Sequence, residues 1–395
     1  MGLTGLRSTF DFSLLFTLLE RDLKFIFLAN LVGSFGDGLY AYILPYYLKE
    51  TLAAAPVQVG LLYATTNVFA ALTLLASGLL GDRFDRKKLL ILGWVFWVPV
   101  PLFFAFAQNW LQMLPGMILW GVYIGPPVST AYILTVVRKD KLTLTLATIS
   151  SAYSLGYVLS PALGGYIAGA LGMKLVFFLA FVFYGIASLL LFLVKSQVPN
   201  KTAENDLYKE GSRWGLLKNR KLIFLSVFMG LVMFTMFIFR PFIPTFLADI
   251  YRYNSFEIGI LGSFTFLGSA ILAVGLGRVG DRFKKSYALA AALMFVGFSL
   301  FLLVLFGNFV ILLFTHFLIG ASFLSWSLTG AIIGPRAPES ARAFSVAVPL
   351  MIGMFGSVLA PYLGGLLYEL SPYYPFYLGI CATIFLTVLA LAKLD

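Results

Sequence analysis

The sequence predicts an all-α membrane protein with twelve transmembrane helices in two six-helix halves. Three observations predict this class. Hydrophobic residues make up 60% of the chain and aromatic residues 17%. Apolar runs of about 20 to 25 residues, long enough to cross roughly 30 Å of hydrocarbon, recur along the whole chain. Motifs also repeat about 200 residues apart, which is typical of a duplicated fold. A β-barrel is disfavoured, because its strands would be about 10 residues long with alternating polarity.

The apolar runs divide the chain into four parts. Residues 1–22 are predicted to form an amphipathic helix at the inner membrane interface, 23–195 the first half, 196–219 a linker without a long apolar run, and 220–395 the second half. The predicted spans lie near residues 24–48, 57–80, 89–107, 112–136, 143–169, 172–195, 221–248, 256–277, 286–306, 309–334, 343–367 and 373–393.

The positions of Lys and Arg predict the orientation, since these residues are retained in the cytoplasmic loops. The predicted inner loops carry most of them, whereas the outer side carries only Lys49, Lys174 and Arg252. The sequence therefore predicts a multi-pass protein of the cell membrane with both termini in the cytoplasm. The formal net charge of +11 reflects topology, so a nucleic-acid partner is not expected. A single cysteine, Cys381, excludes an internal disulfide and a cysteine-based metal cluster, and we expect no cofactor or metal.

The internal repeat is visible when the two halves are aligned. The stretch from Gly78 to Phe84 matches Gly277 to Phe283, at an offset of 281 − 82 = 199. Other matched pairs are Pro45 with Pro244, Gly60 with Gly259, Asn109 with Asn308, and Gly121 with Gly320. The run Gly156 to Gly165 matches Gly356 to Gly365 at 200. Six spans per copy is an even number, so the repeat is parallel and both copies enter from the same side.

The two halves and the loop GLLGDRFDRKK, residues 78–88, resemble the major facilitator superfamily of secondary transporters over essentially the whole chain. The loop is similar to the signature between spans two and three of that family. The signature positions are Gly78, Asp82, Arg83, Arg86 and Lys87, and Asp85 stands where the family usually has glycine. The resemblance implies two six-helix units with a solute path between them and transport by alternating access.

The loop signature has a physical interpretation as a conformational latch. Asp82 can accept hydrogen bonds from the amides at a helix N-terminus of the other half. Arg83 and Arg86 can hold that carboxylate with forked hydrogen bonds, and Asp281 with Arg282 should act in the same way for the second half. Such contacts exist only while the cytoplasmic ends are together, so they would favour the outward-open state. The alternative is an ordinary basic cytoplasmic loop.

The second motif lies in spans five and eleven and is similar to the antiporter signature of the family. Its members are Gly156, Pro161, Gly164, Gly165, Gly356, Pro361, Gly364 and Gly365. Small residues permit close helix packing and proline permits a bend, so packing and bending explain the motif without a coupling role. The Arg that drug antiporters often carry in span four is absent between Met113 and Val136.

Asp37 is the candidate proton-coupling residue, because it lies at the centre of the first span between glycines. Burial in hydrocarbon disfavours the charged form of a carboxyl, which suits a site that binds and releases a proton near neutral pH. The alternative is a structural Asp bonded to a Tyr or to an Asn such as Asn30.

Arg240 in span seven and His316 in span ten are the other ionisable residues within predicted spans. Arg240 would receive an anionic solute, pair with Asp37, or extend toward the outer interface. His316 is either a structural residue or a proton relay. Arg240 lies beyond the midplane toward the predicted outer face, and His316 lies about two turns inside the outer end of span ten. Together with five aromatic residues at central depth they are the candidate solute-binding side chains: Tyr40, Tyr123, Tyr153, Tyr157 and Trp326.

Enzyme classes are disfavoured, because the sequence contains no GxSxG, HExxH or phosphate-binding loop. The predicted function is proton-coupled export of amphipathic or apolar organic compounds by a multidrug-type antiporter. The expected partners are a small organic solute, protons and the lipid bilayer, and the expected state is a monomer. One alternative is an organic-anion exchanger or facilitator organised around Arg240. Another is a transporter-like receptor or scaffold, although the linker and tails are too short to hold a signalling domain.

Overall fold

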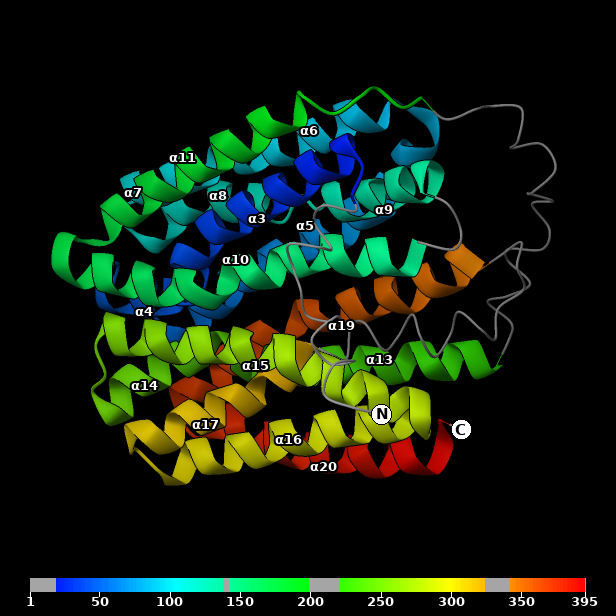
Figure 1. Ribbon diagram of the computed structural model, residues 1–395. Coiled ribbons are helices and arrows are strands. Elements are labelled where there is room, and N and C mark those ends of the chain that lie inside the picture. Colours follow the sequence, from blue (N-terminus) through cyan, green and yellow to red (C-terminus); the bar gives the residue numbers. More distant parts are fainter. Residues whose placement is uncertain (1–18, 138–141, 199–219, 324–341, 395) are drawn as a thin grey trace, which may run out of the picture.

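The computed structural model describes residues 19–137, 142–198, 220–323 and 342–394. Every element within these ranges is a helix, as the sequence predicts for an all-α membrane protein (Figure 1). The predicted interfacial helix and most of the predicted linker lie outside the described residues, and the divisions drawn at residues 22, 195 and 219 stay predictions.

The helices of the first half follow the predicted order of spans. They are α3 (Arg21–Ala41), α4 (Leu44–Glu50), α5 (Pro56–Arg83), α6 (Arg86–Trp97), α7 (Val100–Phe106), η1 (Trp110–Met113), α8 (Leu114–Trp120), α9 (Gly125–Val136), α10 (Leu142–Leu171) and α11 (Met173–Leu191).

The second half repeats this plan. Its helices are α13 (Arg220–Phe239), η3 (Arg240–Phe242), α14 (Ile243–Tyr251), α15 (Ser255–Arg282), α16 (Lys285–Leu305), α17 (Phe309–Ile319), η4 (Gly320–Phe323), α19 (Arg342–Leu370) and α20 (Tyr374–Lys393).

The helix bounds reproduce the internal repeat. Helices α5 and α15 each have 28 residues, and both ends are offset by the same amount, 255 − 56 = 199 and 282 − 83 = 199. Helices α10 and α19 start 342 − 142 = 200 residues apart and end 370 − 171 = 199 apart. The repeat that the sequence predicts is therefore a repeat of structure as well.

Proline residues break the first helix of each half at equivalent points. Helix α3 ends at Ala41 and α4 begins at Leu44, with Pro45 in its first turn. Helix α13 ends at Phe239, and a short 3₁₀ turn with Pro241 leads into α14, whose first turn contains Pro244. Proline lacks an amide hydrogen and its ring clashes with the preceding turn, so each span bends near its middle.

Two pairs of long helices join the halves. Helix α10 packs along α15, and α5 packs along α19 (Figure 1). Backbone meets backbone at two equivalent places, where Gly165 of α10 lies against Ser255 and Gly365 of α19 lies against Pro56. A Cβ at either glycine would collide with a carbonyl group. These glycines thus permit the close approach that joins the halves.

Nine helical segments of the described ranges are long and apolar enough to cross a membrane. The other three predicted spans are not among these nine segments. The span near 112–136 is divided into η1, α8 and α9, because Gly121 and the pair Pro126 and Pro127 interrupt it. The span near 309–334 leaves the described ranges after Phe323, and the span near 343–367 is α19. The multi-pass architecture is confirmed, and the count of twelve is not reached within these ranges.

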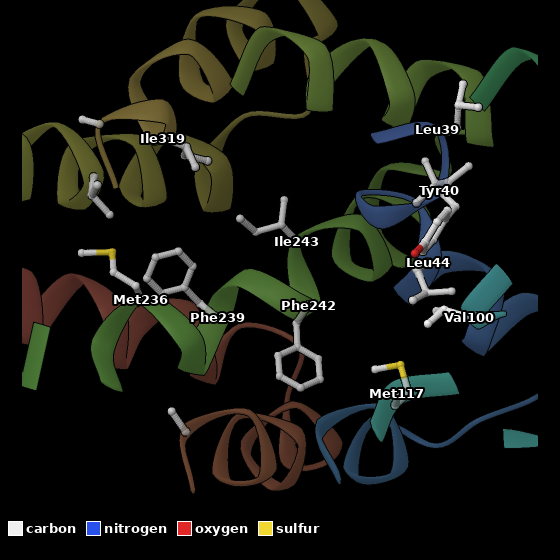
Figure 2. Packing of buried hydrophobic residues seen from close by; sticks show 14 of the residues in the cluster. Leu39, Tyr40, Leu44, Val100, Met117, Met236, Phe239, Phe242, Ile243 and Ile319 are labelled. Carbon is white, nitrogen blue, oxygen red and sulfur yellow. The ribbon is translucent and has the colours of Figure 1, made fainter. Parts of the chain in front are cut away.

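The buried core is apolar in both halves. Large side chains that are fully buried include Phe104 and Phe177 in the first half and Phe246 in the second. Phe239 and Phe242 of the second half are also fully buried (Figure 2). Aromatic pairs fill the space between helices, with ring centroids 4.7 Å apart for Phe246 and Phe376. Many large apolar side chains are exposed on the outer surface of the bundle, as is expected where lipid replaces water.

Candidate functional site

Asp37 lies in the second half of α3, where its side chain is only 3% exposed. Its Oδ1 accepts hydrogen bonds from Tyr40 Oη (3.1 Å) and Trp120 Nε1 (2.9 Å). Tyr184 Oη also donates to Oδ1, and Tyr157 Oη donates to Oδ2. Four donors from four helices therefore converge on one buried carboxyl group.

The local sequence explains this convergence. Tyr40 lies one turn beyond Asp37 in α3, while the other donors come from α8, α10 and α11. Gly36 and Gly38 flank the carboxyl group, and a Cβ at either position would collide with Phe183 or with Ser160. These glycines allow α10 and α11 to approach α3 within hydrogen-bonding distance of the carboxyl.

Three of these four donors to Asp37 lie at Oδ1 and one at Oδ2, and the hydroxyl groups of Tyr40 and Tyr184 also lie 2.9 Å from each other. An ionised Asp only accepts hydrogen bonds, whereas a protonated Asp also donates one. Within the described ranges, the side chain of Asp37 forms no ion pair, so no cation lies within 4.0 Å of it. A proton on Asp37 would turn one accepted bond into a donated bond, and one hydroxyl group would have to change its partner. The binding of a single proton would therefore rearrange the hydrogen bonds of this network.

Asn30, which the sequence offered as a structural partner of Asp37, bonds elsewhere. Its Oδ1 accepts from Tyr153 Oη at 3.1 Å. Asp37 is bonded to tyrosines and a tryptophan instead.

Tyr157 connects the carboxyl group to the second half. Its ring stacks on Phe266 of α15, with centroids 4.5 Å apart and planes 25° apart. Phe266 in turn lies 5.3 Å from the ring of Phe323 in η4. The described aromatic contacts of Tyr40, Trp120 and Tyr184 stay within the first half.

Arg240 begins the 3₁₀ turn that breaks span seven. Its guanidinium carbon lies 3.8 Å from the centroid of Phe323, and the residue is half-buried. An ion pair with Asp37 was one of three alternatives for Arg240, and it is not formed in this structure. The four bonds of Asp37 come from its own half, and no carboxylate of the described ranges lies within 4.0 Å of Arg240.

His316 is fully buried in α17. Its Nδ1 lies 2.8 Å from the carbonyl oxygen of Leu312, and its Nε2 has no hydrogen-bond partner among the described atoms. The ring of Tyr42 lies 6.4 Å from that of His316, and the hydroxyl of Tyr42 also has no hydrogen bond of ordinary geometry. His316 is therefore placed beside the junction between the halves.

The other candidate side chains have different surroundings. Tyr123 packs on Trp97 with centroids 5.6 Å apart, and its backbone N–H donates to Thr73. Tyr153 is bonded to Asn30, as stated above. Trp326 lies outside the described residues.

The predicted latch is described only in part. The structure does not describe the side chains of Asp82 and Asp281, so their contact with a helix of the other half stays a prediction. Arg83 and Arg282 are exposed. Gly78 and Asp82 themselves belong to α5.

The described contacts of the loop signature tie it to its own half. Arg86 donates to Thr135 Oγ1 (2.6 Å) and Gln197 Oε1 (2.8 Å), and Lys87 Nζ donates to the carbonyl of Phe192 (2.8 Å). Asp85 caps the N-terminus of α6, where it accepts from the N–H of Lys87 at 3.0 Å. Its φ is −57°, a value open to any residue, which explains why glycine is not needed at this position.

The glycines of the second motif lie where helices touch. Gly156 approaches Ser34 and Gly164 approaches Leu39, both in α3, and the equivalent Gly356 and Gly364 approach α13. Pro161 lies inside the continuous helix α10, and the carbonyl groups of Pro161 and Pro361 lie against α15 and α5.

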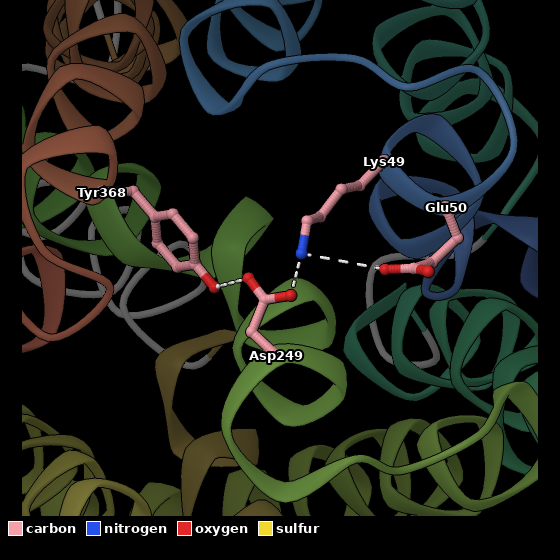
Figure 3. A network of polar contacts seen from close by, with 4 residues as sticks. All are labelled: Lys49, Glu50, Asp249 and Tyr368. Atoms are coloured by element: carbon pink, nitrogen blue, oxygen red, sulfur yellow. Dashed lines mark hydrogen bonds and ion pairs between the residues drawn. The ribbon is translucent and has the colours of Figure 1, made fainter.

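An ion pair links the halves at the ends that the sequence predicts to lie on the outer side of the membrane, here called the outer ends (Figure 3). Lys49 Nζ at the end of α4 pairs with Asp249 of α14, and Tyr368 Oη of α19 donates to the same carboxylate at 2.7 Å. Glu50 lies 3.7 Å from Lys49 Nζ. Nearby, the N–H of Val57 donates to Glu369 at 3.3 Å. The outer ends are therefore held together in this structure.

Sequence reasoning missed several of these residues. Trp120 and Tyr184, two donors to Asp37, were not distinguishable from many other aromatic residues. Lys49 and Asp249 did carry a signal, because they have opposite charges at an offset of 249 − 49 = 200, close to that of the repeat.

The fold and the site together define a multi-pass membrane transporter built from two repeated halves. The family model of the Major Facilitator Superfamily matches residues 26–243 and 229–395. The chain belongs to this superfamily, whose members are transporters and not enzymes.

Relatives cover most of the chain. Multidrug resistance protein 2 of Bacillus subtilis is 24% identical over 90% of this chain and 91% of its own. An uncharacterised MFS-type transporter of Methanocaldococcus jannaschii is 25% identical over 92% of this chain and 97% of its own.

Solved structures share the fold. The crystal structure of nucleoside transporter NupG has a TM-score of 0.75 at 15% identity and covers 94% of this chain and 98% of its own. A bacterial homolog of the human lysosomal transporter Spinster, in an inward-facing and unoccupied conformation, has a TM-score of 0.69 at 16% identity, covering 96% and 95%.

Proposed function

We propose that this transporter exports amphipathic or apolar organic compounds in exchange for protons, by alternating access across the cell membrane, with both termini in the cytoplasm. The observation that carries the proposal is Asp37, a carboxyl group deep in the bundle with four hydrogen-bond donors and no cation within 4.0 Å among the described residues. A buried ionisable group within a membrane is costly and tends to be retained for a function.

Protonation of Asp37 is the step that links the proton to the movement of the halves. The protonated oxygen must donate a hydrogen bond, and Tyr157 is the one partner of Oδ2. Tyr157 also stacks on Phe266 of the other half. A change at the carboxyl group therefore acts on a contact between the halves, which biases the two states of the transporter.

The relatives support the direction and the solute class. Two of them are named multidrug resistance proteins, one from Bacillus subtilis and one from Proteus mirabilis, at 24% and 25% identity. Their names motivate the choice of amphipathic compounds as the first solutes to test.

The test compares wild type with Asp37→Asn in sealed liposomes, with and without an imposed pH gradient. The amide keeps the shape of the protonated acid but cannot release a proton. Uphill, pH-driven transport should fall by at least tenfold, while exchange of solute down its own gradient should remain.

Glu257→Gln is the matched control, because it makes the same acid-to-amide change at the outer end of α15. It should transport like wild type. Full pH-driven accumulation by Asp37→Asn would refute the proposed coupling.

A further inference from the structure

Asp37 and Arg240 differ in their exposure and in their partners. Asp37 is 3% exposed and its oxygens are occupied by four donors of its own half. Arg240 is half-buried and has no carboxylate within 4.0 Å in the described ranges. A cation inside hydrocarbon without a fixed counter-ion is unfavourable, and an anionic ligand relieves that cost.

The geometry of Arg240 leaves its hydrogen-bonding edge available. The guanidinium carbon lies 3.8 Å from the centroid of the Phe323 ring and 5.9 Å from that of Phe237. A guanidinium carries five N–H donors, and none of those of Arg240 is hydrogen-bonded or ion-paired within the described ranges. Such donors match the two oxygens of a carboxylate or sulfonate in a forked arrangement.

Aromatic surface continues from Arg240 across both halves. Phe323 is followed by Phe266 at 5.3 Å and by Tyr157 at 4.5 Å, and all three rings are half-exposed. The hydroxyl of Tyr42, whose ring lies 6.4 Å from Phe266, is buried without a hydrogen bond of ordinary geometry among the described atoms. It offers a neutral polar partner beside the apolar surface.

We infer that Arg240, Phe323, Phe266 and Tyr157 form the solute-binding subsite, and that its preferred ligand is an aromatic organic anion. The anionic group binds the edge of Arg240, and the aromatic rings of the solute pack on the series of rings that joins the halves. A lipophilic cation of the same shape is repelled by the positive charge of Arg240 and binds more weakly. This inference rests on the proposed transport function and narrows its solute class.

The first experiment needs no variant. Binding of three naphthalene probes to the purified protein in nanodiscs is measured by quenching of tryptophan fluorescence, without any pH gradient. The probes are naphthalene-2-sulfonate, neutral 2-naphthol and a naphthylmethyl-trimethylammonium ion, which share one ring system. We expect the sulfonate to bind at least tenfold tighter than the ammonium probe, with the neutral probe between them. Equal binding of the two charged probes, or tighter binding of the cation, overturns the inference.

Variants then test whether the preference for the sulfonate over the ammonium probe depends on Arg240. Arg240→Gln should weaken the sulfonate by at least tenfold and remove the preference over the ammonium probe. Arg240→Lys keeps the charge but loses the planar fork, so it should show an intermediate loss. Lys174→Gln is the matched control, because Lys174 also lies over a phenylalanine ring, Phe106, but at the outer end of the first half, and it should bind like wild type.

Failure of this inference is distinguishable from failure of the proposed function. Asp37→Asn should lose pH-driven transport and keep the preference for the sulfonate over the ammonium probe. That preference depends on the charge of Arg240, whereas the absolute affinity also depends on Tyr157, which is bonded to Asp37. If Asp37→Asn retains coupling while the sulfonate preference holds, the proton-coupling proposal fails and the subsite stands. If Arg240→Gln binds the sulfonate like wild type, the subsite fails and the coupling proposal stands.

Discussion

Asp37 and Met236 occupy equivalent positions in the two halves, since 236 − 37 = 199 is also the offset between α5 and α15. Three hydrogen-bond donors to Asp37 also differ from their counterparts in the second half. Tyr40 corresponds to Phe239 and Trp120 to Ile319 at 199, and Tyr157 to Ser357 at 200. Figure 2 shows Met236, Phe239 and Ile319 close together in an apolar part of the second half.

The difference shows that this scaffold does not need a charge at its centre. Met236, Phe239 and Ile319 are buried and pack without polar partners, so the same arrangement of helices is stable with an apolar set. The carboxyl group of Asp37 and its donors are an addition to the fold of the first half. This favours a functional interpretation of Asp37 over a purely structural one.

The largest expected effect comes from replacing Asp37 with methionine, the residue at the equivalent position of the second half. Asp37→Met alone should destabilise the protein by roughly 3 kcal/mol or more, because several buried donors lose their acceptor at about 1 to 3 kcal/mol each. Adding Tyr40→Phe and Tyr184→Phe should restore most of the loss, since donors and acceptor are then removed together. Thermal unfolding in detergent measures both variants.

The control for this series is Tyr40→Phe with Tyr184→Phe on the wild-type Asp37. It leaves a charged group with two fewer donors and should be less stable than the triple variant. If the triple variant is no more stable than Asp37→Met, the polar network is required for packing and the comparison with the second half fails.

The outer ion pair between Lys49 and Asp249 extends the comparison to a second place. At the offset of 199 that relates Pro45 to Pro244, Asp249 corresponds to Glu50, whereas Lys49 corresponds to the uncharged Ala248. Lys49 and Asp249 are 29% and 20% exposed, so their interaction should contribute about 1 to 2 kcal/mol, between the values for exposed and buried pairs. Asp249→Asn should shift the population toward states with separated outer ends. Spin labels at Thr51 and Arg252 should then report longer distances.

Exchange of the two charges is the control for the outer ion pair. The double variant Lys49→Asp with Asp249→Lys restores an attractive pair, and the label distances should return toward those of wild type. Unchanged distances in Asp249→Asn would show that the close packing of α5 on α19 and of α10 on α15 holds the outer ends without the ion pair.

The sequence predicted those features that depend on local pattern. Apolar length predicted the spans, and repeated motifs predicted the duplicated halves, which α5 and α15 reproduce with the same offset at both ends. Asp37 was identifiable because a carboxyl group within an apolar span is rare and costly.

The partners of these residues were not predictable from local pattern. Trp120 and Tyr184 reach Asp37 from helices about 80 and 150 residues away, and their sequence neighbourhoods resemble those of other aromatic residues. The series from Tyr157 to Arg240 likewise depends on how α10 packs against α15 and η4. Such contacts arise from helix packing, which a single sequence does not specify.

The smallest expected effect concerns the loops that follow α5 and α15, where the halves differ again. Asp85 corresponds to Lys284 at 284 − 85 = 199, and Asp85 caps α6 through its side chain whereas Lys284 gives α16 no side-chain cap. Asp85 also accepts from Ser196 Oγ (2.5 Å) and the N–H of Gln197 (3.0 Å). Asp85→Lys should therefore cost about 1 kcal/mol, the usual value of an N-cap.

The pH dependence of this effect follows from the same hydrogen bonds. Partial burial acts to raise the pKa of Asp85, but the bonds from Ser196, Gln197 and Lys87 outweigh it, so the pKa lies below its ordinary value. A lowered pKa in the folded state means that the carboxylate stabilises the fold above its ordinary pKa of about 4 and loses this effect as the pH falls through the folded pKa. The difference in melting temperature between wild type and Asp85→Asn should be full at pH 7 and shrink on acidification below about pH 4. Ser196→Ala, which removes one donor but keeps the acid, should give a smaller difference with the same sign. A difference that stays constant from pH 7 to pH 3 would show that the ionised carboxylate does not stabilise the loop.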